Sequence, residues 1–386
     1  MARRLLVLLL AFVIGLAGCT TAAPPRGNGS ALVADSGPLD AVVKRTFTAY
    51  GFRLQSGRVL PEMALAYETY GRLAPDGRNA ILITHGGTSS GHAAGKYSPG
   101  DGVPGWWDGL IGPGKAIDTN RYFVVASNVL GSSYGSTAPA SIDPATGKRY
   151  GPDFPAITMR DIVEAQRVLL SALGVNRLVA VAGPSYGGYQ AFQWAVTYPD
   201  FMLGVVPVVT KPTARTRSTN ELTDRFAKDP NWNGGWHYER GGIVATMTEL
   251  RYETLLRYGA NEMYAAAYPD RTQREAFIRQ RAEGWAREFD PNSMVALRRA
   301  RDLRHGAGVR QDPRESALRA LAHRHALSAS DRARRDGQAR EGGRRREVFR
   351  DRQRLRPRRE RSRVGQVGAD AEGVPGLARA LKPRRR

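Results

Sequence analysis

The sequence predicts an α/β fold in which helices cover a central, mostly parallel sheet. Between about residues 41 and 300, short apolar runs alternate with stretches of helical periodicity, a pattern typical of parallel sheets. A Gly-x-Ser-x-Gly sequence lies where one such run meets a helix. The chain has 386 residues, of which 41% are hydrophobic, so it can form one large domain or two smaller ones.

Each element follows from its local pattern. Runs rich in apolar and β-branched residues predict strands at 46–54, 64–70, 80–84, 121–127 and 178–181. Residues 158–173 carry apolar side chains at helical spacing, with Gly174 just beyond their end, and therefore predict a helix. Further helices are expected at 186–197, 243–258 and 272–289.

Positive charge is concentrated in the last quarter of the chain. Of the net charge of +22, residues 301–386 carry +15, from 26 Lys and Arg against 11 Asp and Glu. This segment contains no Ile, Met, Tyr, Trp, Thr or Asn, and Phe349 is its only aromatic residue. It therefore lacks most of the material of strands and cores. Basic residues bind polyanions by charge alone, but without interleaved aromatics we expect no specific nucleic-acid partner.

The first 22 residues have the layout of a secretory signal: Arg3 and Arg4, an apolar run over 5–16, and small residues after it. The run is too short to span a bilayer. Leu16-Ala17-Gly18-Cys19 resembles the bacterial lipobox, so we expect residues 1–19 to be a lipoprotein signal peptide with Cys19 as the lipidation site. Residues 20–40 then form a flexible tether. The protein would be exported and anchored by lipid alone to the bacterial cell envelope, on its periplasmic or outer face.

Gly183-Pro184-Ser185-Tyr186-Gly187 carries the candidate nucleophile. In a sharp turn between a strand and a helix, small flanking residues let the two elements approach while the serine hydroxyl stays exposed. A glycine-rich turn can also serve packing alone, but the strand before it and the helix after it favour Ser185 as a nucleophile. The helix also directs its N-terminal amides at an oxyanion formed there.

A second glycine turn, His85-Gly86-Gly87, follows the expected strand 80–84. In enzymes with a serine in a strand–turn–helix of this kind, the loop after such an earlier strand supplies the second backbone N–H of the oxyanion hole. We assign the oxyanion hole to the backbone N–H groups of Gly87 and Tyr186. His85 and His92 belong to the same loop and precede the serine. We therefore expect a structural or binding role for these two histidines rather than that of the catalytic base.

Several longer segments carry landmarks of a known family. They are Trp106-Trp107-Asp108-Gly109-Leu110-Ile111-Gly112-Pro113-Gly114-Lys115-Ala116-Ile117-Asp118-Thr119, residues 122–130, Tyr134-Gly135-Ser136-Thr137, Gly151-Pro152-Asp153-Phe154-Pro155 and residues 185–200. Over about residues 45–300 the chain resembles the homoserine O-acetyltransferase group of the α/β-hydrolase superfamily. A run of this length is far more specific than the Gly-x-Ser-x-Gly sequence alone.

The resemblance implies an α/β-hydrolase fold with a helical lid over about residues 210–290. It implies a Ser-Asp-His enzyme that takes an acyl group from acetyl-CoA and passes it to a hydroxyl acceptor, so both partners are small molecules. Acetyl-CoA or another acyl donor is then a co-substrate, and neither a bound cofactor nor a metal is expected. The acceptor-carboxylate arginine of the family lies early in the lid, where Arg215 and Arg217 are the candidates, beside Lys211. Dimers are common in the family, so a homodimer is compatible with the resemblance, although the sequence itself does not indicate the oligomeric state.

The resemblance places the catalytic acid near residue 330 and the histidine near residue 360, and neither is identifiable. No histidine follows His325, and the nearby Asp331 and Asp336 lie among arginines without a preceding apolar strand. A G+C-rich gene read out of frame gives this Arg-, Ala- and Gly-rich composition, so we expect a frameshift near residue 300. An evolved basic segment and a solvated, disordered extension are the alternatives. With a frameshift, the last strands of the sheet are missing, and the chain folds poorly and is nearly inactive.

Three functions are consistent with the sequence. The first is acyl transfer through an acyl-Ser185 intermediate, impaired in this chain. The second is a secreted esterase that acts on a small ester with water as the acceptor, because an exported domain does not meet cytosolic acetyl-CoA. The third is a catalytically inactive surface lipoprotein that binds a ligand.

Overall fold

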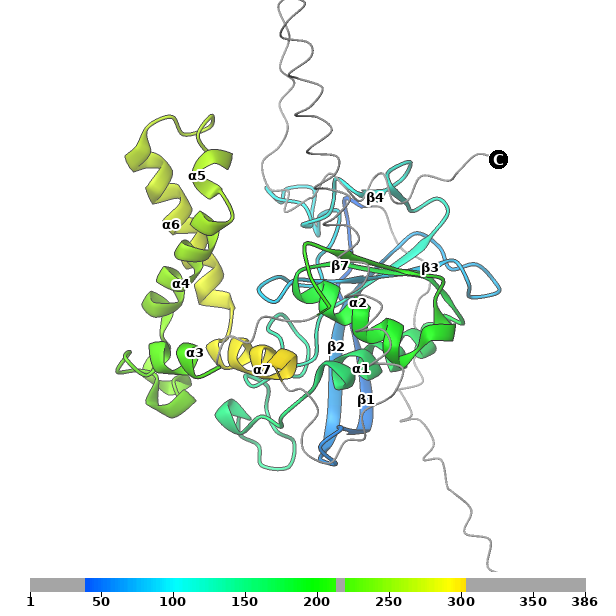
Figure 1. The fold of residues 1–386 in the computed structure, drawn as a ribbon, viewed down its shortest axis with the longest axis horizontal. Coiled ribbons are helices and arrows are strands. Elements are labelled where there is room, and N and C mark those ends of the chain that lie inside the picture. The colour runs from blue at the N-terminus through cyan, green and yellow to red at the C-terminus, as the bar shows by residue number, and fades with distance from the viewer. Residues whose placement is uncertain (1–38, 213–218, 303–386) are drawn as a thin grey trace, which may run out of the picture.

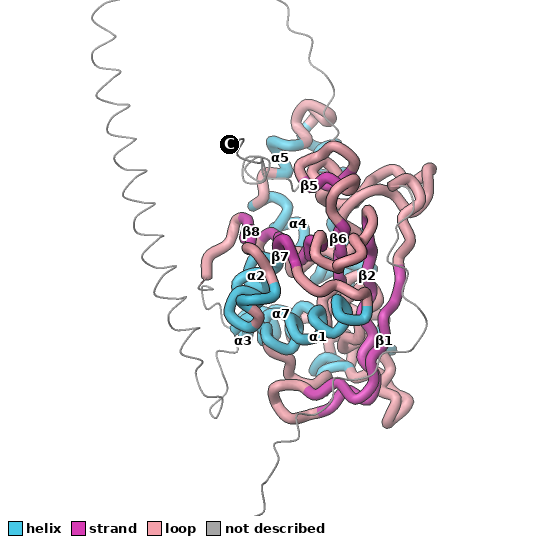
Figure 2. Tube along the Cα trace, turned by 90° about the vertical axis from the view of Figure 1, so that its right-hand side faces the viewer, coloured by secondary structure: helices cyan, strands magenta, loops and turns pink. Residues whose placement is uncertain are grey.

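The computed structural model describes residues 39–212 and 219–302. The expected signal peptide, Cys19, most of the tether, Arg215, Arg217 and residues 303–386 lie outside the described residues. Figures 1 and 2 show a central sheet with helices beside it and a group of lid helices to one side. In the described ranges, no helix is both long and apolar enough to cross a membrane.

The central sheet has six strands in the order β1-β2-β6-β3-β7-β8. Their bounds are β1 (Arg45–Arg53), β2 (Val59–Tyr70), β3 (Ala80–Thr84), β6 (Phe123–Ser127), β7 (Leu178–Pro184) and β8 (Val205–Val208). β1 and β2 pair antiparallel, β2 also meets β6 antiparallel, and β6, β3, β7 and β8 are mutually parallel. The expectation of a mostly parallel sheet is confirmed. A separate pair of short parallel strands consists of β4 (Ile111–Gly112) and β5 (Ile117–Asp118).

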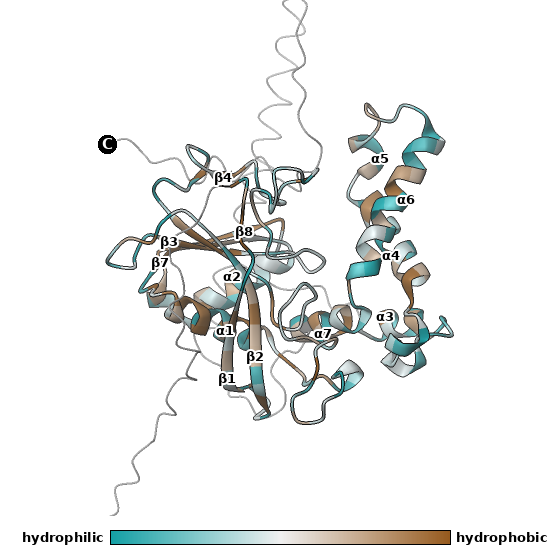
Figure 3. Ribbon diagram, turned by 180° about the vertical axis from the view of Figure 1, so that it is seen from behind, coloured by the Kyte–Doolittle hydropathy of each residue, from teal (hydrophilic) through white to brown (hydrophobic). Residues whose placement is uncertain are grey.

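Successive side chains of each strand point to opposite faces of the sheet, and apolar side chains form a core on each face. In β3, Leu82 belongs to the core that α1 (Met159–Ala172) and α2 (Tyr186–Thr197) cover, whereas Ile81 and Ile83 belong to a second core on the other face. The second core is closed by the loop region that contains Trp107 and the β4–β5 pair. Because both faces are covered, the central strands are apolar throughout, as expected of a parallel sheet. Figure 3 shows hydrophobic colouring concentrated on these strands.

The lid consists of helices that follow β8. They are α3 (Thr219–Phe226), α4 (Val244–Arg257), α5 (Ala260–Met263), α6 (Arg271–Glu288) and α7 (Pro291–Asp302). α4 and α6 pack along each other and extend away from the sheet, while α7 lies nearer to it (Figure 1). Four short 3-10 helices lie at Gly151–Asp153, Pro199–Phe201, Asn233–Gly235 and Tyr238–Arg240.

The structure adds two elements, one after and one before the expected lid: the helix α7 and the strand β8. The expected lid over 210–290 extends further, because α7 continues the helical layer to residue 302. The pattern also did not reveal β8, a strand of four half-buried residues that includes Pro207, because proline is unusual inside a strand. Among the described residues after β8, every regular element is a helix.

Candidate active site

Ser185 occupies the sharp turn between β7 and α2. Its backbone has φ 51° and ψ −111°, a conformation that non-glycine residues rarely adopt. The Ser185 N–H donates to Val208 O of β8 at 2.9 Å, and Ser185 O accepts from Gly188 N at 3.0 Å. The neighbouring strand and the first turn of α2 thus hold the strained backbone in place, and the residue is exposed.

The two glycines of the Gly-x-Ser-x-Gly sequence are required by close packing against β3. A Cβ atom at Gly183 would lie 2.2 Å from Thr84 O, and one at Gly187 would lie 2.1 Å from the same oxygen. The hydroxyl of Thr84 donates to Gly187 O at 2.9 Å. The end of β3 and the start of α2 therefore approach as closely as backbones can, and this contact fixes the orientation of the turn.

Gly87 lies beside the first residue of α2. A Cβ atom at Gly87 would be 3.5 Å from the Cβ of Tyr186, so the loop after β3 and the start of α2 meet next to Ser185. No described residue accepts a hydrogen bond from the Gly87 N–H. The structure thus brings together Ser185, Gly87 and Tyr186 as the sequence predicts, although their catalytic roles remain predictions.

The side chain of His85 stabilises the loop after β3 through hydrogen bonds of both ring nitrogens. It is buried, its Nδ1 lies 2.7 Å from Gly86 O, and its Nε2 accepts the Val129 N–H at 3.0 Å. Since Nε2 is an acceptor, Nδ1 carries the proton and donates to the carbonyl. Burial lowers the pKa of His85 to about 4, so the ring is neutral at neutral pH. Both nitrogens serve the loop, in agreement with the structural role expected for His85.

The lid contacts the loop after β3 through Thr88; we call residues 85–92 the oxyanion loop, after the role predicted for Gly87. Arg251 of α4 donates from Nη1 to Thr88 Oγ1 at 3.0 Å, and Trp285 of α6 donates from Nε1 to Thr88 O at 2.9 Å. The guanidinium of Arg251 also lies over the indole of Trp285, 5.1 Å from its centroid. Further along, Tyr186 Oη donates to Leu297 O of α7 at 3.1 Å. Three lid helices, α4, α6 and α7, therefore form hydrogen bonds with residues around Ser185.

The three histidines of the described residues are all engaged away from Ser185. His85 holds the oxyanion loop, His92 Nδ1 bonds Glu68 Oε2 at 3.0 Å, and His237 Nε2 bonds Asp290 Oδ1 at 3.2 Å. Within residues 39–212 and 219–302, no histidine forms a hydrogen bond with the Ser185 hydroxyl. In the described part of the chain, the turn at Ser185 and the loop after β3 therefore meet, but none of the three histidines bonds to the serine.

The two carboxyl–histidine pairs were not foreseen from the sequence. Glu68 and His92 are 24 residues apart, and His237 and Asp290 are 53 residues apart, so no local spacing signals either pair. Both residues of the second pair are largely buried, and the ring of His237 stacks on Trp232. Among the described residues, no group of three or more His, Cys, Asp or Glu side chains is arranged to hold a metal ion.

Comparison with known proteins identifies the family. A family profile described as alpha/beta hydrolase fold matches residues 79–287. A homoserine O-acetyltransferase of Solidesulfovibrio magneticus is 40% identical over 295 residues, covering 69% of this chain and 74% of that protein. Another, from Symbiobacterium thermophilum, is 42% identical over 272 residues, covering 65% and 70%. The chain belongs to the homoserine O-acetyltransferase family of α/β hydrolases.

Solved structures of similar proteins carry two kinds of name. The homoserine O-acetyltransferase of Bacillus anthracis has a TM-score of 0.61 and 33% identity, covering 68% of this chain and 76% of that one. A crystallised esterase has a TM-score of 0.59 and 33% identity, covering 68% and 78%. The fold of this family member is therefore also that of a protein named as an esterase.

Proposed function

We propose that this chain belongs to the acyl-transferring members of its family and acts through an acyl-Ser185 intermediate. The observation that carries the proposal is the backbone of Ser185, which has a positive φ at the start of α2 and leaves the residue exposed. Such conformations cost about 1–3 kcal/mol and cluster at functional sites. Packing alone would not require a serine there, because a glycine adopts this φ without strain.

The residues around Ser185 suit both halves of the reaction. In the first, Ser185 Oγ attacks the acyl carbon of a donor such as acetyl-CoA, a base takes the hydroxyl proton, and the bond from that carbon to the leaving sulfur breaks as the base gives the proton to the sulfur. In the second, an acceptor hydroxyl attacks the serine ester, the base takes its proton, and the bond from the acyl carbon to Ser185 Oγ breaks as the base gives that proton to Oγ. The N–H groups of Gly87 and Tyr186 would stabilise the oxyanion in both steps. Arg215 and Arg217 are the proposed acceptor-binding residues.

We further propose that this chain lacks its base because the reading frame shifts near residue 300. The histidines at 85, 92 and 237 are engaged elsewhere. The other three, His305, His323 and His325, lie in the Arg-rich segment outside the described residues. Loss of triad members leaves only about 10³- to 10⁴-fold catalysis over water, so we expect strongly impaired activity.

Hydrolysis is the second candidate. The exposure of Ser185 favours it, because water then reaches an acyl-serine readily, and a similar solved structure is named as an esterase. Lipidation of Cys19 and export, which we also propose, would separate the domain from cytosolic acetyl-CoA. An inactive, ligand-binding surface lipoprotein is the third candidate.

One set of assays separates these functions. Turnover of a small acyl ester is measured with and without acetyl-CoA and a hydroxyl acceptor, in the chain and in Ser185→Ala. Gene sequencing across codons 290 to 386 and an intact mass establish which frame the cell translates. We expect another frame to supply apolar strands, an Asp near 330 and a His near 360. Robust turnover by the Arg-rich chain, abolished by Ser185→Ala, would contradict the proposed impairment.

A further inference from the structure

A chain of buried side-chain hydrogen bonds connects α1 and α2 with the oxyanion loop. Trp194 of α2 donates from Nε1 to Gln166 Oε1 of α1 at 2.8 Å, and Gln166 Nε2 donates to Gln190 Oε1 at 2.7 Å. Gln190 Nε2 then donates to His85 O at 3.3 Å and to Tyr186 O at 3.5 Å. Trp194, Gln166 and Gln190 are each no more than 1% exposed, so these bonds form away from bulk water.

The direction of this chain is fixed by its first member. An indole N–H can only donate, so Gln166 presents its carbonyl oxygen to Trp194 and its NH2 group to Gln190. The amide of Gln190 is thereby oriented with both N–H donors toward the carbonyls of His85 and Tyr186. A well-packed apolar pair of similar shape could fill the same space at little cost, so packing alone does not explain two buried glutamines.

Gln190 bridges the two segments whose N–H groups are the predicted oxyanion donors. His85 comes directly before Gly86 and Gly87 in the oxyanion loop, and Tyr186 is the first residue of α2. One side-chain amide therefore holds a carbonyl of each segment. A shift of the loop relative to α2 would move the Gly87 N–H away from the Tyr186 N–H, and Gln190 opposes that shift.

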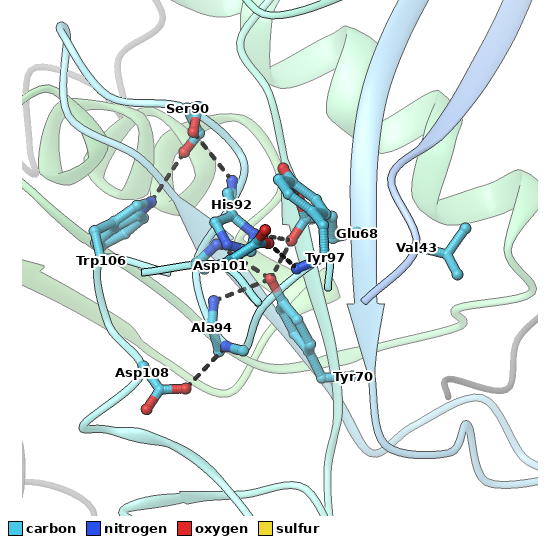
Figure 4. A network of polar contacts seen from close by, with 12 residues as sticks. Val43, Glu68, Tyr70, Ser90, His92, Ala94, Tyr97, Asp101, Trp106 and Asp108 are labelled. Atoms are coloured by element: carbon cyan, nitrogen blue, oxygen red, sulfur yellow. Dashed lines mark hydrogen bonds and ion pairs between the residues drawn. The ribbon is translucent and has the colours of Figure 1, made fainter. Parts of the chain in front are cut away.

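The other end of the oxyanion loop has an anchor of its own. Figure 4 shows His92, Tyr97 and Tyr70 converging on Glu68 of β2. Glu68 accepts Tyr97 Oη at 2.7 Å and lies 3.0 Å from His92 Nδ1. This network fixes the loop where it ends, whereas Gln190 acts where the loop begins.

We propose that Gln190 is a positioning residue for the oxyanion hole. By joining the loop to α2, it keeps the N–H groups of Gly87 and Tyr186 directed at one point beside Ser185 Oγ. Its described hydrogen bonds reach backbone carbonyls and Gln166, so it acts through the backbone and not by contact with the substrate. This inference rests on the proposed function, because it requires acyl chemistry at Ser185.

Hydrogen exchange in the full chain tests the anchoring. Gln190→Met keeps a side chain of similar size but removes the donors, so we expect amide exchange over residues 86–89 to become at least about fivefold faster. Gln193→Met is the matched control, because Gln193 lies on the same helix and its Nε2 donates to Thr197 Oγ1 instead. Equal exchange in the two variants would overturn the proposal.

Methylboronic acid tests the consequence for the oxyanion hole. Its boron accepts an electron pair from Ser185 Oγ, the serine proton passes to solvent, and a boron oxygen of the tetrahedral adduct takes the place of the oxyanion. Boron NMR measures the adduct in the full chain. We expect binding at least about tenfold weaker in Gln190→Met and unchanged in Gln193→Met. Gln190→Glu keeps the acceptor for Gln166 and, protonated by burial, one donor, so its binding should be intermediate. This variant also preserves the shape and carries the test if Gln190→Met does not fold.

The outcomes separate this inference from the proposed function. No tetrahedral adduct in the parent chain, or equal binding in Ser185→Ala, would remove the proposed nucleophile and with it the role of Gln190. Binding that depends on Ser185 but is equal in the Gln190 variants and Gln193→Met would leave the proposed function standing and overturn the positioning role alone.

Discussion

Ser185 depends on glycines that have no room for a side chain. We expect Gly187→Ala to lower the free energy of unfolding by about 1–3 kcal/mol, because its Cβ would lie 2.1 Å from Thr84 O. Gly204→Ala is the control, since a Cβ there meets no atom within 4 Å. Urea unfolding measures both variants. Equal stability of Gly187→Ala and Gly204→Ala would show that the turn tolerates a wider separation from β3.

His85 makes the stability of the molecule depend on pH. Its pKa is about 4 in the folded chain and 6.5 in an unfolded one, so between these values the unfolded chain binds more protons. Stability is therefore fully present above pH 6.5 and falls, by about 3 kcal/mol in total, as the pH drops towards 4. Unfolding of the chain and of His85→Gln across this window measures the effect. The variant should show a shallower pH slope, and an equal slope would contradict a neutral, buried His85.

At the residue scale, the sequence indicates which residues lie together only where the signal is local. Ser185, Gly87 and Tyr186 could be placed together because a strand–turn–helix pattern and a glycine turn each follow a recognisable strand. The Glu68–His92 pair could not, because its residues come from β2 and from the loop after β3 and are joined only through the sheet. Arg251 likewise reaches Thr88 across 163 residues. No local spacing predicts such contacts.

At the scale of elements, the lid helices α4 and α6 contact the oxyanion loop through hydrogen bonds from Arg251 and Trp285 to Thr88. Trp285→Phe keeps an aromatic ring next to Phe289 but removes the Nε1 hydrogen bond to Thr88 O. A net hydrogen bond contributes about 1 kcal/mol, so we expect amide hydrogen exchange over residues 86–89 to become about fivefold faster. Trp236→Phe, at an exposed lid position, is the control and should leave this exchange unchanged. Equal exchange in both variants would show that the lid does not stabilise the loop.

Strands with strong apolar patterns were predicted closely, and irregular ones were not. β3 and α2 have the bounds that the sequence predicts, 80–84 and 186–197, because buried apolar runs and glycine punctuation are local signals. β8 was missed, and the beginning of β2 was placed several residues late. The first half of β2 is partly exposed, so pairing with β1 rather than apolar character makes it a strand.

At the scale of the whole molecule, the described sheet ends at β8. Val209, directly after this strand, is 69% exposed, and Leu203, just before it, is 68% exposed. Apolar side chains at an unpaired sheet edge are unfavourable in water. This exposure supports the proposal that the native frame continues with further strands beside β8, and that these strands carry the missing acid and base.

The most direct measurement is the labelling of Ser185 by a fluorophosphonate, followed by peptide mass. Two chains are compared, the Arg-rich one and one in which the codons after about residue 300 are read in the frame that supplies an Asp and a His. We predict labelling of Ser185 in the second chain, none in its Ser185→Ala variant, and labelling slower by at least about 10³-fold in the Arg-rich chain. Equal labelling of both chains would show that the Arg-rich chain supplies a base of its own and would contradict the proposed impairment. Absence of labelling in the second chain would show that Ser185 is not the nucleophile.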